Sequence, residues 1–65
     1  MHVQISVKGH LALRWQEWFG GLQIAHLEDG TSLLSGTLPD QAALYGVLWQ
    51  LCDQGIALLA FTSSH

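Results

Sequence analysis

Cys52 is the only cysteine among the 65 residues of this chain, so no intrachain disulfide can form. A domain of this length buries only about 60% of the surface that its unfolded chain exposes, and it lies near the lower limit of independent stability. Small domains without disulfides often gain stability by associating with other copies. We therefore predict one domain over residues 1–65 that is stabilised as a homo-oligomer, a dimer or something larger.

The composition agrees with this expectation, because 49% of the residues are hydrophobic and only 11% are charged. Charged residues usually make up about 25% of a soluble domain. The net charge of −3 is unsuited to neutralising a run of phosphates, so we expect no nucleic-acid or membrane partner. A lone cysteine is typical of a reducing compartment, and the sequence shows neither a signal peptide nor a long apolar span. We expect a cytoplasmic protein without a cofactor.

The first twenty residues predict a strand followed by a short helix. Apolar and polar residues alternate from His2 to Lys8, which is the pattern of a half-buried strand. From Leu11 to Phe19, apolar residues recur at helical spacing, and Gly20 can end the helix. The start of this helix has no Ser, Thr, Asp or Asn to cap it, so an aromatic-rich loop is the alternative.

The pair Asp29-Gly30 lies between two runs that are typical of strands, residues 22–27 and 31–37. Asp-Gly between such runs is a strong signal for a hairpin, because the turn needs a positive φ angle. A two-residue turn would place His26 opposite Leu33. A bulge at the turn would reverse the faces of both strands, so the inward face stays open at this point.

The second half of the chain predicts a helix and a final strand. Thr37 can cap the helix, with Pro39 and Asp40 in its first turn, and Gly55 suits its end. Residues 56–61 form an almost continuous apolar run of strand length. Such a run is typical of a central strand that is buried on both faces. We expect the polar residues that follow it to form a tail.

The predicted order is strand, helix, strand, strand, helix, strand. This order is that of an α+β, ferredoxin-like βαββαβ sandwich, in which both helices cover one face of an antiparallel sheet. The other face of the sheet is then left open to solvent or to a partner.

Two predicted elements carry more apolar surface than this architecture covers. The second helix has an additional apolar stripe, and the final strand has an apolar set that would face the open side of the sheet. The predicted interface residues are Tyr45, Trp49, Cys52, Ala57, Leu59 and Phe61. We expect dimerisation through the open sheet face, and the helix stripe allows a larger assembly. The alternative is that the first helix buries both stripes of the second.

A few polar and aromatic residues could bind a ligand. The candidates are His10, Arg14, Trp15, Trp18 and His26. A histidine on an apolar strand face is usually structural, and an exposed Arg14–Glu17 pair is more common than an anion site. The four histidines show no metal-binding spacing, so we predict no metal site within the chain. Cys52 on an apolar stripe is more often a packed thiol than a nucleophile.

Three segments of the chain resemble a group of small, uncharacterised prokaryotic proteins. They are WQEWFGGL at residues 15–22, DGT at 29–31 and DQAALYGVL at 40–48. The resemblance covers nearly the whole chain and implies a stand-alone α+β domain, with no activity, ligand or catalytic residue to carry over. The element order is also similar to that of ACT and heavy-metal-associated domains, although the C-x-x-C motif of the latter is absent.

Three functional hypotheses follow from these observations. The first is a non-enzymatic interaction or regulatory module that acts as a homo-oligomer and binds another protein or a small ligand. The second is a small oligomeric enzyme or ligand-binding protein with a pocket near His26 and Arg14. The third is a metal carrier that uses histidines from different chains.

Overall fold

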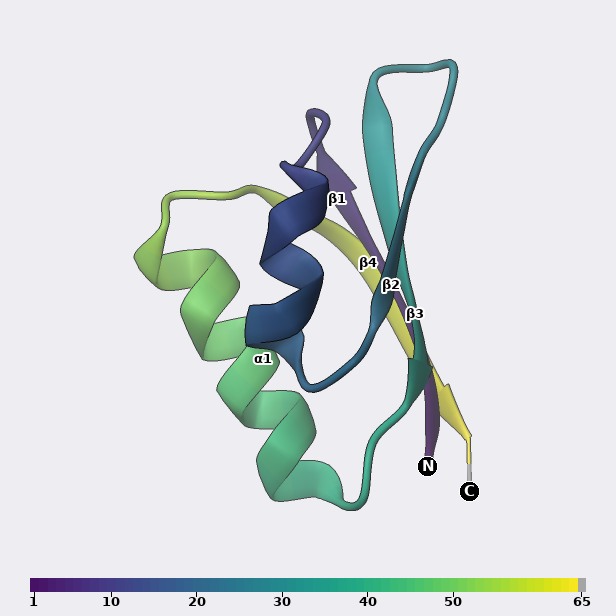
Figure 1. The fold of residues 1–65 in the computed structure, drawn as a ribbon, viewed down its shortest axis with the longest axis vertical. Helices are drawn as coiled ribbons and strands as arrows, with labels where there is room; N and C mark the ends of the chain where they lie inside the picture. Colours follow the sequence, from purple (N-terminus) through teal and green to yellow (C-terminus); the bar gives the residue numbers. More distant parts are fainter. Residues whose placement is uncertain (65) are drawn as a thin grey trace.

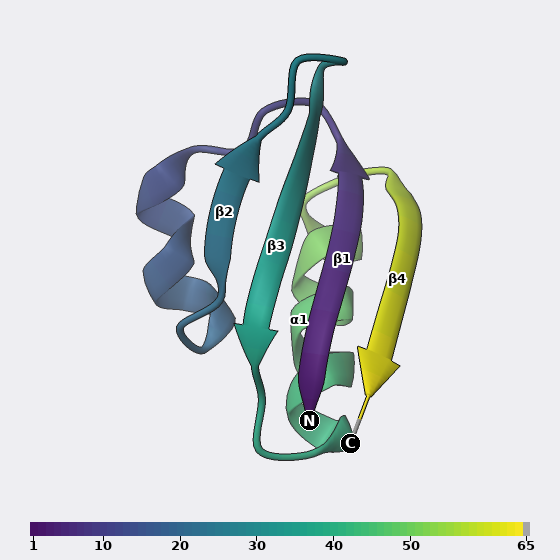
Figure 2. The same ribbon diagram turned by 90° about the vertical axis from the view of Figure 1, so that its right-hand side faces the viewer.

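The computed structural model describes residues 1–64, which form four strands, one α-helix and one 3-10 helix. In chain order the elements are β1 (His2–Lys8), η1 (Leu13–Phe19), β2 (Gln23–His26), β3 (Thr31–Thr37), α1 (Gln41–Asp53) and β4 (Leu58–Ser64). The strands form one antiparallel sheet in the order β2-β3-β1-β4, and both helices lie on the same side of it (Figures 1 and 2). The fold is therefore α+β, as the sequence predicted.

Strand β1 lies in the middle of the sheet, between β3 and β4. Its alternation is confirmed, because Val3, Ile5 and Val7 are fully buried while Gln4 is exposed. These side chains face the helices and meet the inner face of α1. The rest of the apolar core consists of Leu11, Phe19, Leu22, Ile24, Leu34, Leu38, Leu44, Val47 and Leu51.

The β2–β3 hairpin is also confirmed. Gly30 has φ of +86°, a left-handed conformation that the turn requires and that glycine adopts readily. The register pairs His26 with Ser32 rather than with Leu33, so the predicted partner is wrong by one residue. Directly paired residues point to the same face of a sheet, and Ser32 is fully buried. His26 therefore lies on the helix-covered side of the sheet, as does Ile24 two residues earlier.

The first predicted α-helix is a 3-10 helix, so the sequence prediction of two α-helices is wrong. Ala12 offers no side-chain cap, and the amide of Trp15 donates to the carbonyl of Ala12 with the shorter 3-10 spacing. In a 3-10 helix residues i and i+3 lie in line. This geometry stacks Trp15 on Trp18 and leaves Trp18 exposed, while Phe19 is buried. Gly20 ends the helix with φ of +68°, as predicted.

The N-cap of helix α1 lies three residues after the predicted one, Thr37. Asp40 is the N-cap, and its Oδ1 accepts a hydrogen bond of 2.9 Å from the amide of Ala43. Thr37 is the last residue of β3, because its backbone pairs with His2 and is not available to start a helix. The predicted end is confirmed, since the helix stops before Gly55 at φ of +75°.

Strand β4 is an edge strand, so the prediction of a central strand buried on both faces is wrong. Its only strand neighbour among residues 1–64 is β1, and all seven of its residues are exposed. It also begins at Leu58 and continues to Ser64, through most of the segment predicted as a polar tail. His65 lies outside the described residues. The apolar run was a true strand signal, but burial did not follow from it.

The faces of β4 also differ from the prediction. Phe61 lies opposite the buried Ile5, which places it on the helix side of the sheet rather than on the open face. The open face carries mainly polar residues, such as the row in which Gln4 lies between Ser35 and Thr62. An apolar contact between two sheets therefore has little support on this face.

The first prediction concerns the start of α1. Replacing Asp40 with Ala removes the acceptor for the amide of Ala43, so the free energy of unfolding should fall by about 1 kcal/mol. Asp53→Ala is the matched control, because it removes the same charge at the other end of the helix, where no cap is lost. Urea unfolding followed by circular dichroism measures both. Equal stability of the Asp40→Ala variant and the native chain would contradict the assignment of the cap.

Candidate functional site

Large apolar side chains are exposed along α1 and β4. We define the apolar edge surface as Tyr45, Trp49, Cys52, Leu58, Leu59 and Phe61, all of which are exposed. Trp49 is 76% exposed and Tyr45 61%, and Leu59 and Phe61 expose about half of their area. Ala57, which was predicted at the interface, is exposed directly before β4. The predicted interface residues are thus accessible.

The two parts of the apolar edge surface lie on the same side of the molecule. The other flank of α1 faces η1, because Ala43, Gly46 and Gln50 line a groove together with Trp18. Figure 2 shows η1 beside β2, at the opposite edge of the sheet from β4. The Tyr45–Cys52 flank of α1 therefore faces the β4 edge. The two patches that the sequence treats as separate therefore both lie toward the β4 edge.

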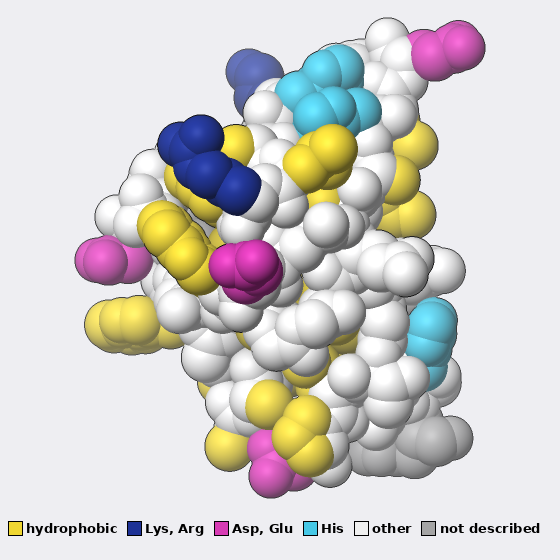
Figure 3. Space-filling view, in the orientation of Figure 1, with side chains coloured by type: hydrophobic (Ala, Val, Ile, Leu, Met, Phe, Trp, Pro, Cys, Tyr) yellow, Lys and Arg dark blue, Asp and Glu magenta, His cyan; other side chains and the backbone are white. Residues whose placement is uncertain are grey.

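His10 and His26 form a stacked pair at one end of the molecule. Their ring centroids are 4.5 Å apart, and the ring planes differ by only 4°. The Nε2 atom of His10 lies 2.8 Å from the carbonyl oxygen of Leu27, and that of His26 lies 2.6 Å from the carbonyl oxygen of Leu11. A carbonyl only accepts hydrogen bonds, so each Nε2 carries a hydrogen and each Nδ1 is left for other partners. Figure 3 shows histidine side chains clustered here near basic ones.

This arrangement joins two segments that the sequence did not bring together. The spacing of His10 and Arg14 would place them on one face of a helix, but η1 begins only at Leu13, so His10 lies before it. Its ring instead packs on His26 from the end of β2. The crossed hydrogen bonds tie the β1–η1 connection to the end of β2.

The stacked pair is poorly arranged for chelating a metal ion. The lone pair of an imidazole nitrogen lies in the plane of its ring, and two nearly parallel rings direct their lone pairs along separate planes rather than to one point. Among residues 1–64, no three His, Cys, Asp or Glu side chains gather in a way that could hold a metal ion. His2 is exposed on β1, at the other end of that strand from His10.

Ser32 is a structural residue that the sequence analysis missed. It is fully buried, its hydroxyl donates to the carbonyl of Gly9 at 2.7 Å, and its oxygen accepts from the amide of Leu11 at 2.9 Å. The side chain thus satisfies two backbone groups on either side of His10. The sequence could have indicated this role, because Ser32 is two residues before Leu34 on the same strand. Alternate residues of a strand share a face, and Leu34 faces the core.

The remaining predicted ligand residues lie on η1. The rings of Trp15 and Trp18 stack at 5.7 Å, Trp15 meets Phe19 edge-on at 6.3 Å, and Arg14 is exposed. Trp18 borders the groove between η1 and α1, which has a volume of about 440 Å³. The five predicted ligand residues therefore do not form one group. His10 stacks on His26, and Trp15 stacks on Trp18, with Arg14 next to Trp15 on η1.

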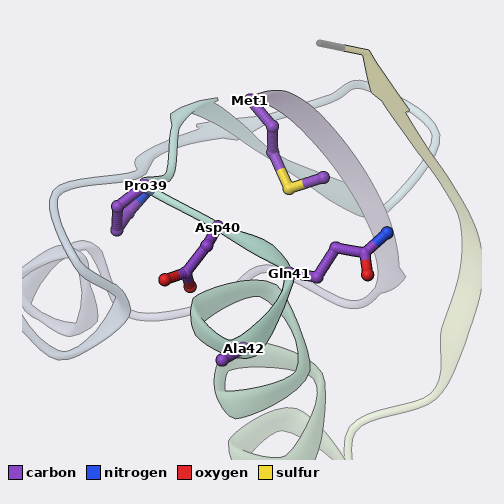
Figure 4. A pocket seen from close by; sticks show the side chains of 5 residues that line it. All are labelled: Met1, Pro39, Asp40, Gln41 and Ala42. Carbon is purple, nitrogen blue, oxygen red and sulfur yellow. The ribbon is translucent and has the colours of Figure 1, made fainter.

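A second hollow of about 530 Å³ lies at the start of α1 (Figure 4). It is lined by Met1, Pro39, Asp40, Gln41 and Ala42. Asp40 already accepts the hydrogen bond that caps the helix, and Figure 4 shows that its side chain points away from that of Gln41. The polar groups around this hollow do not converge on one point, as they would in a site that orients a small ligand.

The contacts of the hairpin turn lower the pKa of the Asp29 carboxyl group. Its pKa lies below the ordinary 3.8, chiefly because the hydroxyl of Thr31 donates to Oδ1 at 2.6 Å. The amide of Thr31 also donates to Oδ1 at 3.1 Å, and the charge of His10 acts in the same direction. These contacts hold the hairpin turn in its shape.

Comparison with known families places the chain in a family described as a Domain of unknown function (DUF8691), which matches residues 2–62. The chain belongs to this family. The match agrees with the resemblance to an uncharacterised group, although it does not single out the three segments on which that resemblance rested. No curated protein and no solved structure matched the chain. Within residues 1–64, neither helix has the length and apolar character needed to span a membrane.

The second prediction concerns Ser32. Replacing it with Ala leaves the carbonyl of Gly9 and the amide of Leu11 without their partner, so the free energy of unfolding should fall by about 1–3 kcal/mol. Ser35→Ala, a change of the same size on the open face of β3, should have little effect. Chemical unfolding distinguishes them. Equal losses in both variants would show that the Ser32 contacts do not stabilise this end of the fold.

The third prediction concerns the turn. In a Thr31→Val variant, the pKa of Asp29 should rise toward 3.8, as measured by carboxyl chemical shifts during a pH titration. A lowered pKa stabilises the fold above the unfolded value of 3.8, and this stabilisation is lost as the pH falls through the folded value. The variant should therefore lose less stability on acidification. Thr37→Val is the control, and an unchanged Asp29 pKa in Thr31→Val would refute the assignment.

Proposed function

We propose that this chain is a non-enzymatic interaction or regulatory module that acts as a homo-oligomer through its apolar edge surface. The observation that carries the proposal is the exposure of Trp49, Tyr45 and Phe61 on one side of a domain with few charges. Contiguous apolar patches on soluble proteins usually mark interaction sites. A second copy presents the same patch and can cover it symmetrically.

The size of the domain is compatible with a standard interface. The chain exposes 4185 Å² of surface, so the roughly 800 Å² that each partner typically contributes is about a fifth of it. Burying one large apolar side chain contributes roughly 1.5–3 kcal/mol. In a symmetric interface both copies bury the same side chains, so each contribution occurs twice. This burial would add stability to a domain that is otherwise small for independent folding.

The non-enzymatic part of the proposal is supported by the polar side chains themselves. His10 and His26 bond to backbone carbonyls, and the Ser32 hydroxyl bridges two backbone groups. Asp40 caps a helix and Asp29 holds a turn. These side chains are used to hold the backbone, whereas a catalytic site directs such groups at a substrate.

The groove between η1 and α1 favours one alternative, a ligand-binding protein. Its volume of about 440 Å³ falls within the usual range for small-molecule sites, and Trp18 offers an exposed ring at its border. The groove lies on the flank of α1 away from the apolar edge surface, so a ligand there would not compete with a second copy. A metal carrier has less support, because the parallel rings of His10 and His26 do not converge.

We also propose that the fold is a ferredoxin-like variant in which η1 takes the place of the first helix. The strand order β2-β3-β1-β4, with η1 and α1 as the two crossovers, supports this view. A cytoplasmic location is proposed from Cys52, a free and exposed thiol that suits a reducing compartment.

The fourth prediction tests association. Light scattering should give the native chain a mass of at least twice 7.1 kDa, and Trp49→Glu or Phe61→Glu should bring it to 7.1 kDa. Trp18→Glu is the matched control, because Trp18 is also exposed but lies outside the apolar edge surface. Circular dichroism checks that each variant is folded. A native mass of 7.1 kDa at millimolar concentration would refute the proposal, as would dissociation by Trp18→Glu alone.

A further inference from the structure

The two edges of the sheet are protected to different degrees. Edge β2 has only four residues, and η1 lies beside it (Figure 2). The side chain of Gln16 on η1 reaches this edge, and its Oε1 accepts a hydrogen bond of 2.9 Å from the amide of Ile24. The ring of His26, at the end of β2, bonds to the carbonyl of Leu11. The β2 edge is thus short and partly covered by side chains and by a helix.

The β4 edge has none of these devices within residues 1–64. It is seven residues long, and Leu58–Ser64 contains no charged residue and no proline. Lysine, proline and short length are the usual means by which edge strands avoid pairing with other chains. The register shift near Leu58 and Leu59 affects only the start of the strand, since the pairs from Ser6–Ala60 to His2–Ser64 are regular. A regularly paired stretch of five residues, Ala60 to Ser64, therefore has its unpaired backbone groups on the exposed edge.

We infer that β4 pairs with β4 of a second copy, antiparallel and about a two-fold axis, to form one continuous eight-stranded sheet. This inference rests on the proposed homo-oligomer and assigns the contact within it. A two-fold axis perpendicular to the sheet keeps both α1 helices on the same side of the joined sheet. The exposed stripes of Tyr45 and Trp49 then face each other above the joint between the two copies.

Several features favour a second copy as the occupant. The strand is uncharged, so two copies meet without repulsion, whereas an acidic or basic peptide finds no countercharge on it. The pairing supplies main-chain hydrogen bonds, and the neighbouring flank of α1 supplies apolar contacts. Face-to-face stacking of two sheets has no comparable support, because the open face carries rows such as Gln4 with Ser35 and Thr62.

The fifth prediction tests this pairing with a charge at the joint. Thr62 is exposed and lies on the open face of β4, outside the apolar edge surface. Thr62→Lys places like charges from both copies close together, so the dimer should dissociate at least tenfold more readily at low salt, with partial recovery at high salt. Gln23→Lys adds the same charge to the β2 edge and should leave the dissociation constant unchanged. Equal effects of the two variants would overturn the pairing.

Amide hydrogen exchange of the native chain supplies a test that needs no variant. In an isolated edge strand only every second amide is bonded to the neighbouring strand, whereas a strand with two neighbours protects both sets. We expect every amide from Ala60 to Ser64 to be protected in the concentrated protein. A dimer in which only alternate amides are protected overturns the β4 pairing but leaves the homo-oligomer standing. A chain that stays monomeric overturns both.

Discussion

The domain is held together by the burial of Val3, Ile5 and Val7 on the central strand β1. These side chains are fully buried, and β3 and β4 pair with β1 on its two sides. Helix α1 covers this row with Leu44, Val47 and Leu51, the stripe that faces the core. Everything else is arranged around this single apolar layer, because 64 described residues provide one α-helix and one short 3-10 helix to cover the sheet.

Because the two helices cover only part of the sheet, its two edges are protected to different degrees. Helix η1 protects the β2 edge, and the Ser32 hydroxyl and the stacked histidines fasten the chain beside it. Within residues 1–64 no strand covers the outer edge of β4, and Leu59 and Phe61 are exposed. The same asymmetry explains how a chain with 11% charged residues can be folded and still expose large apolar side chains.

Local sequence patterns predicted most of the helices and strands. They did not predict where each element lies in the fold, because this depends on residues that are far apart in the chain. Alternation identified β1, Asp29-Gly30 identified the hairpin, and Gly55 marked the end of α1. The apolar run of β4 predicted a strand but not its edge position, since such a run is typical of a buried central strand and β4 is exposed at the edge of the sheet. The stacking of His10 on His26 depends on a connection and a hairpin end that meet only in the folded chain.

In the proposed dimer, the β4 edge of one copy is completed by the β4 edge of another. An isotope-filtered NOE spectrum, recorded on a mixture of labelled and unlabelled chains, reports only contacts between copies. We expect cross-peaks between backbone protons of residues 60–64 on opposite chains, together with contacts between the Trp49 rings. Cross-peaks from the open sheet face instead, through Gln4 or Ser35, would contradict this pairing, as would a spectrum without contacts between copies.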